Sequence, residues 1–96
     1  MLRELMMRVI VRFLGSIADS IGKKEERFEL DEKACLRDLV AVLAEKYRIF
    51  EGAEESALSK GLIFIVNGRS IYLLKGMETD LTEGTRITII PAYAGG

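Results

Sequence analysis

The most informative stretch of this 96-residue chain is Leu62-Ile63-Phe64-Ile65-Val66-Asn67-Gly68. Its first five residues form a continuous apolar run, which is typical of a strand inside a sheet. Asn67-Gly68 is a residue pair that tolerates the positive φ angles of a tight hairpin turn. The sequence therefore predicts a β-hairpin, with Ser70–Leu74 as the second strand.

Upstream of this hairpin, one segment has the spacing of an amphipathic helix. Its charged residues avoid a narrow apolar stripe, which predicts a helix that packs on a core. The stripe consists of Leu36, Leu39, Val40, Leu43 and Tyr47. The segment 48–61 that follows is polar, bounded by Gly61, and reads as a long connection back to the sheet.

Both ends of the chain carry alternating apolar patterns. Met7–Leu14 and Phe28–Leu30 predict a first pair of strands, joined by a Gly- and Ser-containing loop, 15–26, with one short helical turn. Arg86–Ile90 predicts a last strand, and Pro91 ends its hydrogen-bonding pattern because proline has no N–H donor.

The predicted order is strand, strand, helix, strand, strand, strand. This order indicates an α+β fold, in which a mixed sheet of about five strands is covered on one face by one main helix. The length allows a single domain spanning residues 1–96.

Composition excludes several classes of function. Fourteen Lys and Arg residues against 15 Asp and Glu give a net charge of -1, so no broad positive surface attracts nucleic acid or an anionic membrane. The apolar run 5–14 is broken by Arg8 and Arg12 and is not an export signal, so we expect a cytoplasmic protein.

Cys35 is the single cysteine, and the chain has no histidine. The usual N and S ligands of a metal are therefore missing, and no intrachain disulfide can form. A thiol near a helix N-terminus can become reactive, which leaves a persulfide relay open as an alternative. The favoured interpretation is a small core or capping residue, because free cysteine is commonly buried.

The C-terminal segment 91–96 reads Pro-Ala-Tyr-Ala-Gly-Gly. With no element left to join, it is predicted to be a flexible tail that projects from the last strand, reaching about 20 Å when extended. Gly95 and Gly96 lack Cβ atoms, so the backbone can pass through a narrow slot and present the terminal carboxylate unhindered. A terminal Gly-Gly occurs by chance in roughly one chain in two hundred, so the pair favours a function at the C-terminus.

Several short motifs carry a more specific signal. They are Arg12-Phe13-Leu14 leading to Gly22, Leu36-Arg37-Asp38-Leu39, Val66-Asn67-Gly68-Arg69, Leu74-Lys75-Gly76 with Thr79 and Leu81, and Pro91 through Ala94-Gly95-Gly96. Over nearly its whole length the sequence resembles the ubiquitin-like β-grasp sulfur carriers, which include the thiamine-type carriers. It is most similar to the small subunits of molybdopterin synthase. It departs from the family pattern at Glu83-Gly84-Thr85, where an Asp-Gly-Asp turn is frequent, and at Cys35, where Thr or Ser is usual.

The resemblance implies that the Gly96 carboxylate, with Gly95 before it, is the working group. An ATP-dependent activating enzyme related to those that activate ubiquitin would adenylate it, and sulfur from a persulfide would displace AMP to give a thiocarboxylate. That group would then supply sulfur to a pterin precursor in the large synthase subunit, for the dithiolene of a molybdenum or tungsten cofactor. The chain would bind no cofactor or metal itself, the catalytic residues would belong to the partner, and two small and two large chains would form a heterotetramer.

The uncovered face of a one-helix sheet is expected to bind the partner. The predicted docking residues are Ile71, Leu73, Ile90, Pro91, Tyr93 and Ala94. Packing of some of these side chains in the main core remains the alternative, because strand register decides which face each occupies. Three functional alternatives also stay open, namely a protein modifier conjugated to lysines, a sulfur carrier for thiamine or tRNA thiolation, and an inert interaction domain.

Overall fold

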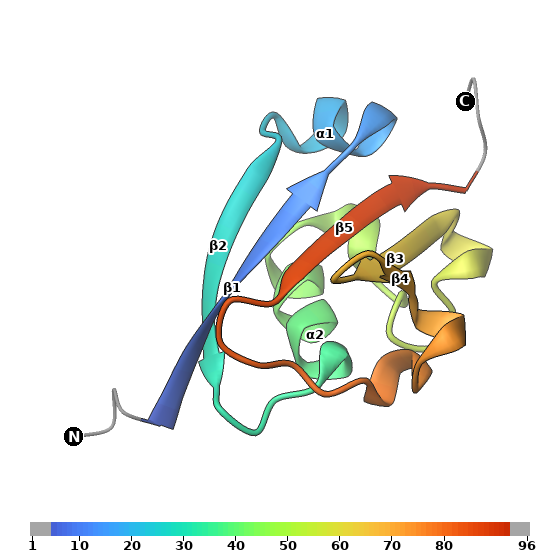
Figure 1. The fold of residues 1–96 in the computed structure, drawn as a ribbon. Helices are drawn as coiled ribbons and strands as arrows, with labels where there is room; N and C mark the ends of the chain where they lie inside the picture. Colours follow the sequence, from blue (N-terminus) through green and yellow to red (C-terminus); the bar gives the residue numbers. More distant parts are fainter. Residues whose placement is uncertain (1–4, 93–96) are drawn as a thin grey trace.

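The computed structural model describes residues 5–92, which form a five-stranded mixed sheet with two helices (Figure 1). The strands are β1 (Met6–Phe13), β2 (Glu25–Asp31), β3 (Leu62–Val66), β4 (Arg69–Ser70) and β5 (Arg86–Pro91). The helices are α1 (Gly15–Ile21) and α2 (Leu36–Lys46). The predicted α+β architecture, with one main helix over one face of the sheet, is confirmed.

The strand order in the sheet is β2-β1-β5-β3-β4. The neighbouring strands β1 and β5 are parallel, and the other three neighbouring pairs are antiparallel. Because β1 and β5 are parallel, the end of β5 lies beside the end of β1 and the start of α1 (Figure 1).

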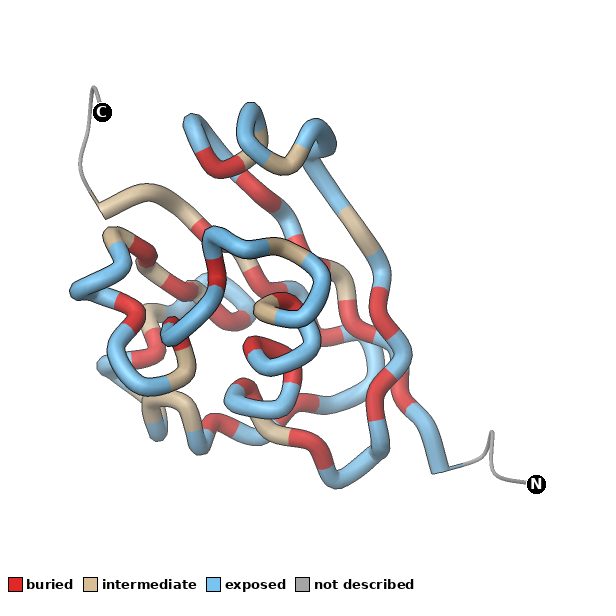
Figure 2. The backbone as a smooth tube through the Cα atoms, turned by 180° about the vertical axis from the view of Figure 1, so that it is seen from behind, coloured by how far each residue is buried: buried red, intermediate tan, exposed pale blue. Residues whose placement is uncertain are grey.

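Alternation along the strands places the core. Met7, Val9, Val11 and Phe13 of β1 are buried against α2, whereas Arg8 and Arg12 between them are exposed. The apolar stripe of α2 covers the same face, with Leu36, Leu39, Val40 and Leu43 buried. Figure 2 shows these buried positions as alternating bands along the strands and as one side of the helix.

The predicted loop 15–26 contains more regular structure than expected. Residues Gly15–Ile21 form α1, which Gly22 ends in a left-handed conformation, and Ile17 is buried against the sheet. β2 is also longer than the predicted Phe28–Leu30, because Glu25 to Asp31 all pair with β1.

The hairpin after β3 has the predicted turn, in which Asn67 and Gly68 both have positive φ. Its second strand is much shorter than the predicted Ser70–Leu74, since only Arg69 and Ser70 pair with β3. Residues Ile71–Leu73 instead form a 3₁₀ turn that starts at Ser70, whose hydroxyl accepts a hydrogen bond from the Tyr72 N–H at 3.3 Å.

The long connection 48–61 packs against the domain. Phe50, Ala53 and Ala57 are buried, and two 3₁₀ turns, Arg48–Phe50 and Leu58–Lys60, interrupt it. The Phe50 ring lies 6.2 Å from the Phe13 ring, centroid to centroid. A segment that is mostly polar therefore closes one end of the core. None of the helices in the described part of the chain is long and apolar enough to cross a membrane.

Candidate functional site at the end of the last strand

The last strand continues further than the sequence indicated. Pro91 still pairs with Leu62 of β3, and the Ala92 N–H donates a hydrogen bond to the Gly61 carbonyl at 2.8 Å. Proline lacks a donor, but here its missing N–H does not end the pairing because the next residue supplies one. The predicted tail 91–96 is thus fixed to the sheet at its first two residues.

A second contact holds Pro91 from the side of α1. The Leu14 N–H donates to the Ile89 carbonyl at 3.1 Å, which brings the start of α1 against the end of β5. Gly15 has a φ of +56°, and a Cβ at this position would lie 3.1 Å from Pro91 Cγ. Glycine is therefore needed at residue 15 for both its conformation and its close approach. We call Pro91 and Ala92, held between Gly15 and Gly61, the tail root.

The remaining predicted tail residues, Tyr93, Ala94, Gly95 and Gly96, lie outside the described residues. The role assigned to them from the sequence stays a prediction. The structure adds that the chain is anchored up to Ala92, four residues before the terminal carboxylate.

The face of the sheet opposite α2 has an apolar centre, which we call the open face. Its half-buried residues come from the three middle strands and are Ile10, Ile63, Ile65, Thr88 and Ile90. Ile63 and Ile90 are direct partners in the β3–β5 ladder, next to the tail root. Ile90 is a predicted docking residue and lies on this face.

Two other predicted docking residues, Ile71 and Leu73, do not lie on this face. Ile71 is only 3% exposed and belongs to the core, so its side chain is not available to a partner and its assignment as a docking residue is corrected. The reason is the short β4, because the 3₁₀ turn after Ser70 directs Ile71 inward. Leu73 is 77% exposed but lies in that turn, beyond the paired part of β4.

Three isoleucines of the open face, Ile10, Ile63 and Ile65, were not predicted as docking residues. Their signal was present in the sequence as apolar residues on both faces of the Met7–Leu14 and Leu62–Val66 strands. Without the register, the sequence could not show that Ile63 stands beside Ile90.

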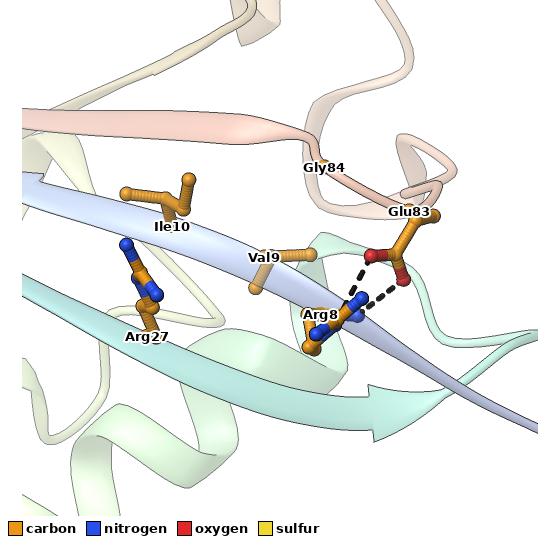
Figure 3. A pocket seen from close by; sticks show the side chains of 6 residues that line it. All are labelled: Arg8, Val9, Ile10, Arg27, Glu83 and Gly84. Carbon is orange, nitrogen blue, oxygen red and sulfur yellow. Dashed lines mark hydrogen bonds and ion pairs between the residues drawn. The ribbon is translucent and has the colours of Figure 1, made fainter. Parts of the chain in front are cut away.

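Charged groups border the open face at the end far from the tail root. Glu83 accepts hydrogen bonds from the Arg8 backbone N–H at 2.9 Å and from Arg8 Nε at 3.2 Å (Figure 3). The backbone hydrogen bond is the main cause that lowers the pKa of Glu83, and the Arg8 charge adds to it. A shallow hollow of about 160 Å³ lies beside this pair, lined by Arg8, Val9, Ile10, Arg27, Glu83 and Gly84.

Metal binding and cysteine chemistry are two further kinds of site to compare with residues 5–92. No three side chains among His, Cys, Asp and Glu of that range cluster as metal ligands would. Cys35 is half-buried at the N-cap of α2, where its N–H donates to Asp38 Oδ2 at 2.9 Å. The backbone of Cys35 is therefore part of the start of α2, and the capping role of its thiol stays a prediction.

Comparison with known proteins finds relatives that match most of the chain. The model of the ThiS family matches residues 11–96. The chain is 27% identical over 92 residues to the small archaeal modifier protein 3 of Haloferax volcanii, covering 94% of this chain and all of that protein. It is 29% identical over 91 residues to the molybdopterin synthase sulfur carrier subunit of Caenorhabditis briggsae, covering 95% of this chain and all of that subunit.

Solved structures agree on the fold. The solution structure of the small archaeal modifier protein 1 from Methanosarcina acetivorans superposes with a TM-score of 0.73 at 25% identity, and the alignment covers 95% of this chain and 98% of that one. The sheet and helix arrangement is accordingly the ubiquitin-like β-grasp.

Proposed function

This chain belongs to the ThiS family, and we propose that it carries sulfur as a thiocarboxylate on Gly96, as the small subunit of a molybdopterin synthase. The observation that carries the proposal is the tail root. It anchors β5 at Ala92 and leaves four residues, ending in Gly95-Gly96, to enter a partner. Four residues span at most about 13 Å, a useful depth for a buried active site.

The proposed cycle needs two other proteins in the cytoplasm. In the first, an activating enzyme, the Gly96 carboxylate attacks the α-phosphorus of ATP and releases pyrophosphate, which yields an acyl adenylate. A persulfide sulfur then attacks the acyl carbon, AMP leaves, and reductive cleavage of the S–S bond by a thiol leaves the thiocarboxylate. ATP is used by that enzyme, and no cofactor is assigned to this chain.

The second protein is the large synthase subunit, in which the thiocarboxylate sulfur attacks a pterin precursor. Water then cleaves the bond between sulfur and the Gly96 acyl carbon, which returns Gly96 as a carboxylate and leaves the sulfur on the pterin for the dithiolene of a molybdenum or tungsten cofactor. The chain supplies the sulfur and its positioning, and the acid and base groups are assigned to the partner. We propose a heterotetramer of two small and two large chains, docked through the open face beside the tail root. The likeness to the sulfur carrier subunit over 95% of the chain supports this assignment.

The direct test is mass spectrometry of the protein isolated from its own cells. We expect the mass increase that replacement of one carboxylate oxygen by sulfur produces, located on the C-terminal peptide. A chain in which both terminal glycines are replaced by alanine, and a chain extended beyond Gly96, should lack the modification and fail to support synthesis of the cofactor. Cofactor synthesis at the normal rate with either variant would refute the proposal.

A second candidate is a protein modifier, in which the activated Gly96 carboxylate forms an isopeptide bond with lysines of other proteins. The alignment with the whole of the archaeal modifier protein favours it. It predicts Gly-Gly remnants on many cellular lysines after tryptic digestion, in a strain in which the residue before Gly95 is replaced by arginine. A sulfur carrier for thiamine or tRNA thiolation would carry the same thiocarboxylate, and loss of thiamine or of thiolated tRNA in a deletion strain separates it.

A further inference from the structure

One row of side chains on the open face carries positive charge without any carboxylate. The ladder places Arg27 of β2, Ile10 of β1 and Arg86 of β5 side by side. The neighbour of Arg86 on its other side is the Asn67 side chain, whose Oδ1 accepts the Arg86 backbone N–H at 2.9 Å. The row is therefore an isoleucine flanked by two guanidinium groups.

The neighbouring rows differ, because each already contains a carboxylate. Arg12 stands opposite Glu25, and Arg8 stands opposite Glu29 and also binds Glu83. Within residues 5–92, neither Arg27 nor Arg86 forms a salt bridge. Both residues are exposed, so each guanidinium can accept a partner from outside the chain.

The hollow beside this row shows which ligand chemistry suits it. Figure 3 shows the Arg27 side chain extending from β2 toward β1 beside Ile10, while Glu83 occupies the far side of the same hollow with its carboxylate on Arg8. One carboxylate is thus already bound there through an arginine and a backbone N–H. Arg27, which forms no salt bridge within residues 5–92, offers its guanidinium to a second carboxylate.

We propose that the Arg27–Ile10–Arg86 row binds an aspartate or glutamate side chain of the protein that docks on the open face, with an apolar side chain of that protein covering Ile10. This inference rests on the proposed function, since it adds a specificity contact to the same docking event. Two guanidinium groups on either side of an apolar contact disfavour partners that lack a matching acid. Docking of such a partner removes water from the charges and provides no carboxylate to replace it, which costs free energy.

The row also fixes how the partner lies. Arg86 is the first residue of β5 and Pro91 the last, so about 17 Å separates the carboxylate site from the tail root at ~3.3 Å per residue. A partner that contacts both ends spans the whole apolar centre of the open face. Such a two-point contact sets the direction in which the tail enters, whereas an isoleucine patch alone leaves the docking angle loosely determined.

The test measures, by calorimetry, the binding of charge-reversal variants to the large synthase subunit of the same cells. We expect Arg27→Glu and Arg86→Glu each to raise the Kd for that subunit roughly five- to tenfold, and the wild-type Kd to rise with salt. Arg48→Glu is the matched control, because Arg48 is also exposed, lies in the 3₁₀ turn after α2, and forms no ion pair within residues 5–92. Its Kd should stay within twofold of wild type.

Two further measurements make the outcome decisive. Thermal unfolding of each variant checks that the sheet is intact, and an Asp→Arg or Glu→Arg scan of the partner should find one position that restores binding of Arg27→Glu. Unchanged affinity of both arginine variants, with binding still lost in Ile90→Glu, would overturn this inference and leave the proposed function standing. A wild-type chain that does not bind the large synthase subunit would overturn both.

Discussion

Replacement of Gly15 by alanine tests the tail root most directly. Two penalties apply at this residue. A left-handed φ of +56° is unfavourable for alanine by about 1 kcal/mol, and the new Cβ would lie 3.1 Å from Pro91 Cγ, an overpacked contact of about 1–2 kcal/mol. Gly76 is the matched control, because its φ is +57° but no atom lies within 4 Å of a Cβ built there.

The assay is thermal unfolding followed by circular dichroism. A loss of 1 kcal/mol shifts the Tm of a domain of this size by roughly 4–8 °C, so we expect that shift for Gly76→Ala and about twice as much for Gly15→Ala. In the background of Pro91→Ala, which removes the crowding ring atoms, the extra penalty of Gly15→Ala should disappear. That difference is the coupling free energy between residues 15 and 91.

The structural reasoning is refuted if Gly15→Ala and Gly76→Ala lower the Tm equally, or if the penalty of Gly15→Ala is independent of Pro91. The functional consequence can be followed in the same variants. Since Gly15 holds the tail root, Gly15→Ala should slow adenylation of Gly96 by the activating enzyme more than Gly76→Ala does.

Three further outcomes follow from other contacts. Glu26 is 12% exposed; burial alone would raise its pKa, but hydrogen bonds from Lys46 and from the Tyr47 hydroxyl at 2.5 Å outweigh this and hold the pKa below the ordinary value of 4.5. The stabilisation by the Glu26 carboxylate is therefore complete above pH 4.5 and is lost as the pH falls through the folded pKa. Glu26→Gln should lower the free energy of unfolding, measured with urea, by roughly 1–3 kcal/mol at pH 7 and by less at pH 3. A larger difference between wild type and variant at pH 3 than at pH 7 contradicts this. Ile90→Glu should abolish binding of the large subunit without unfolding the domain. Leu73→Glu changes a more exposed residue outside the paired sheet and should weaken that binding much less. Equal losses of affinity in the two variants would place Leu73 in the interface. Cys35→Ser should raise the free energy of unfolding by about 0.5–1 kcal/mol, because a hydroxyl is a better N-cap acceptor for α2, and should leave thiocarboxylate formation intact; loss of the thiocarboxylate would instead assign Cys35 to sulfur relay.

The elements with strong local signals were predictable from sequence. The stripe of α2 has one dominant period, the Asn67-Gly68 turn needs positive φ, and β1 and β5 alternate clearly, so their existence follows from local rules. The β4 boundary did not follow, because Ser70 to Leu74 is apolar enough for a strand, and only the Ser70 hydroxyl and the packing of Ile71 turn the chain into a 3₁₀ helix. The buried Phe50 in a polar connection was missed for a similar reason, since its partner ring, Phe13, is far away in sequence.

For the site, the Gly95-Gly96 pair and the family resemblance are visible in the sequence alone, because both depend only on the order of the residues. The neighbours that depend on strand register are visible only in the folded chain. Folding brought Gly15 against Pro91, joined Ala92 to Gly61, set Ile63 beside Ile90 and lined up Arg27, Ile10 and Arg86 from three strands. Side chains alternate with a period of two along a strand, so the neighbours of a residue across a sheet are fixed only when the strands pair.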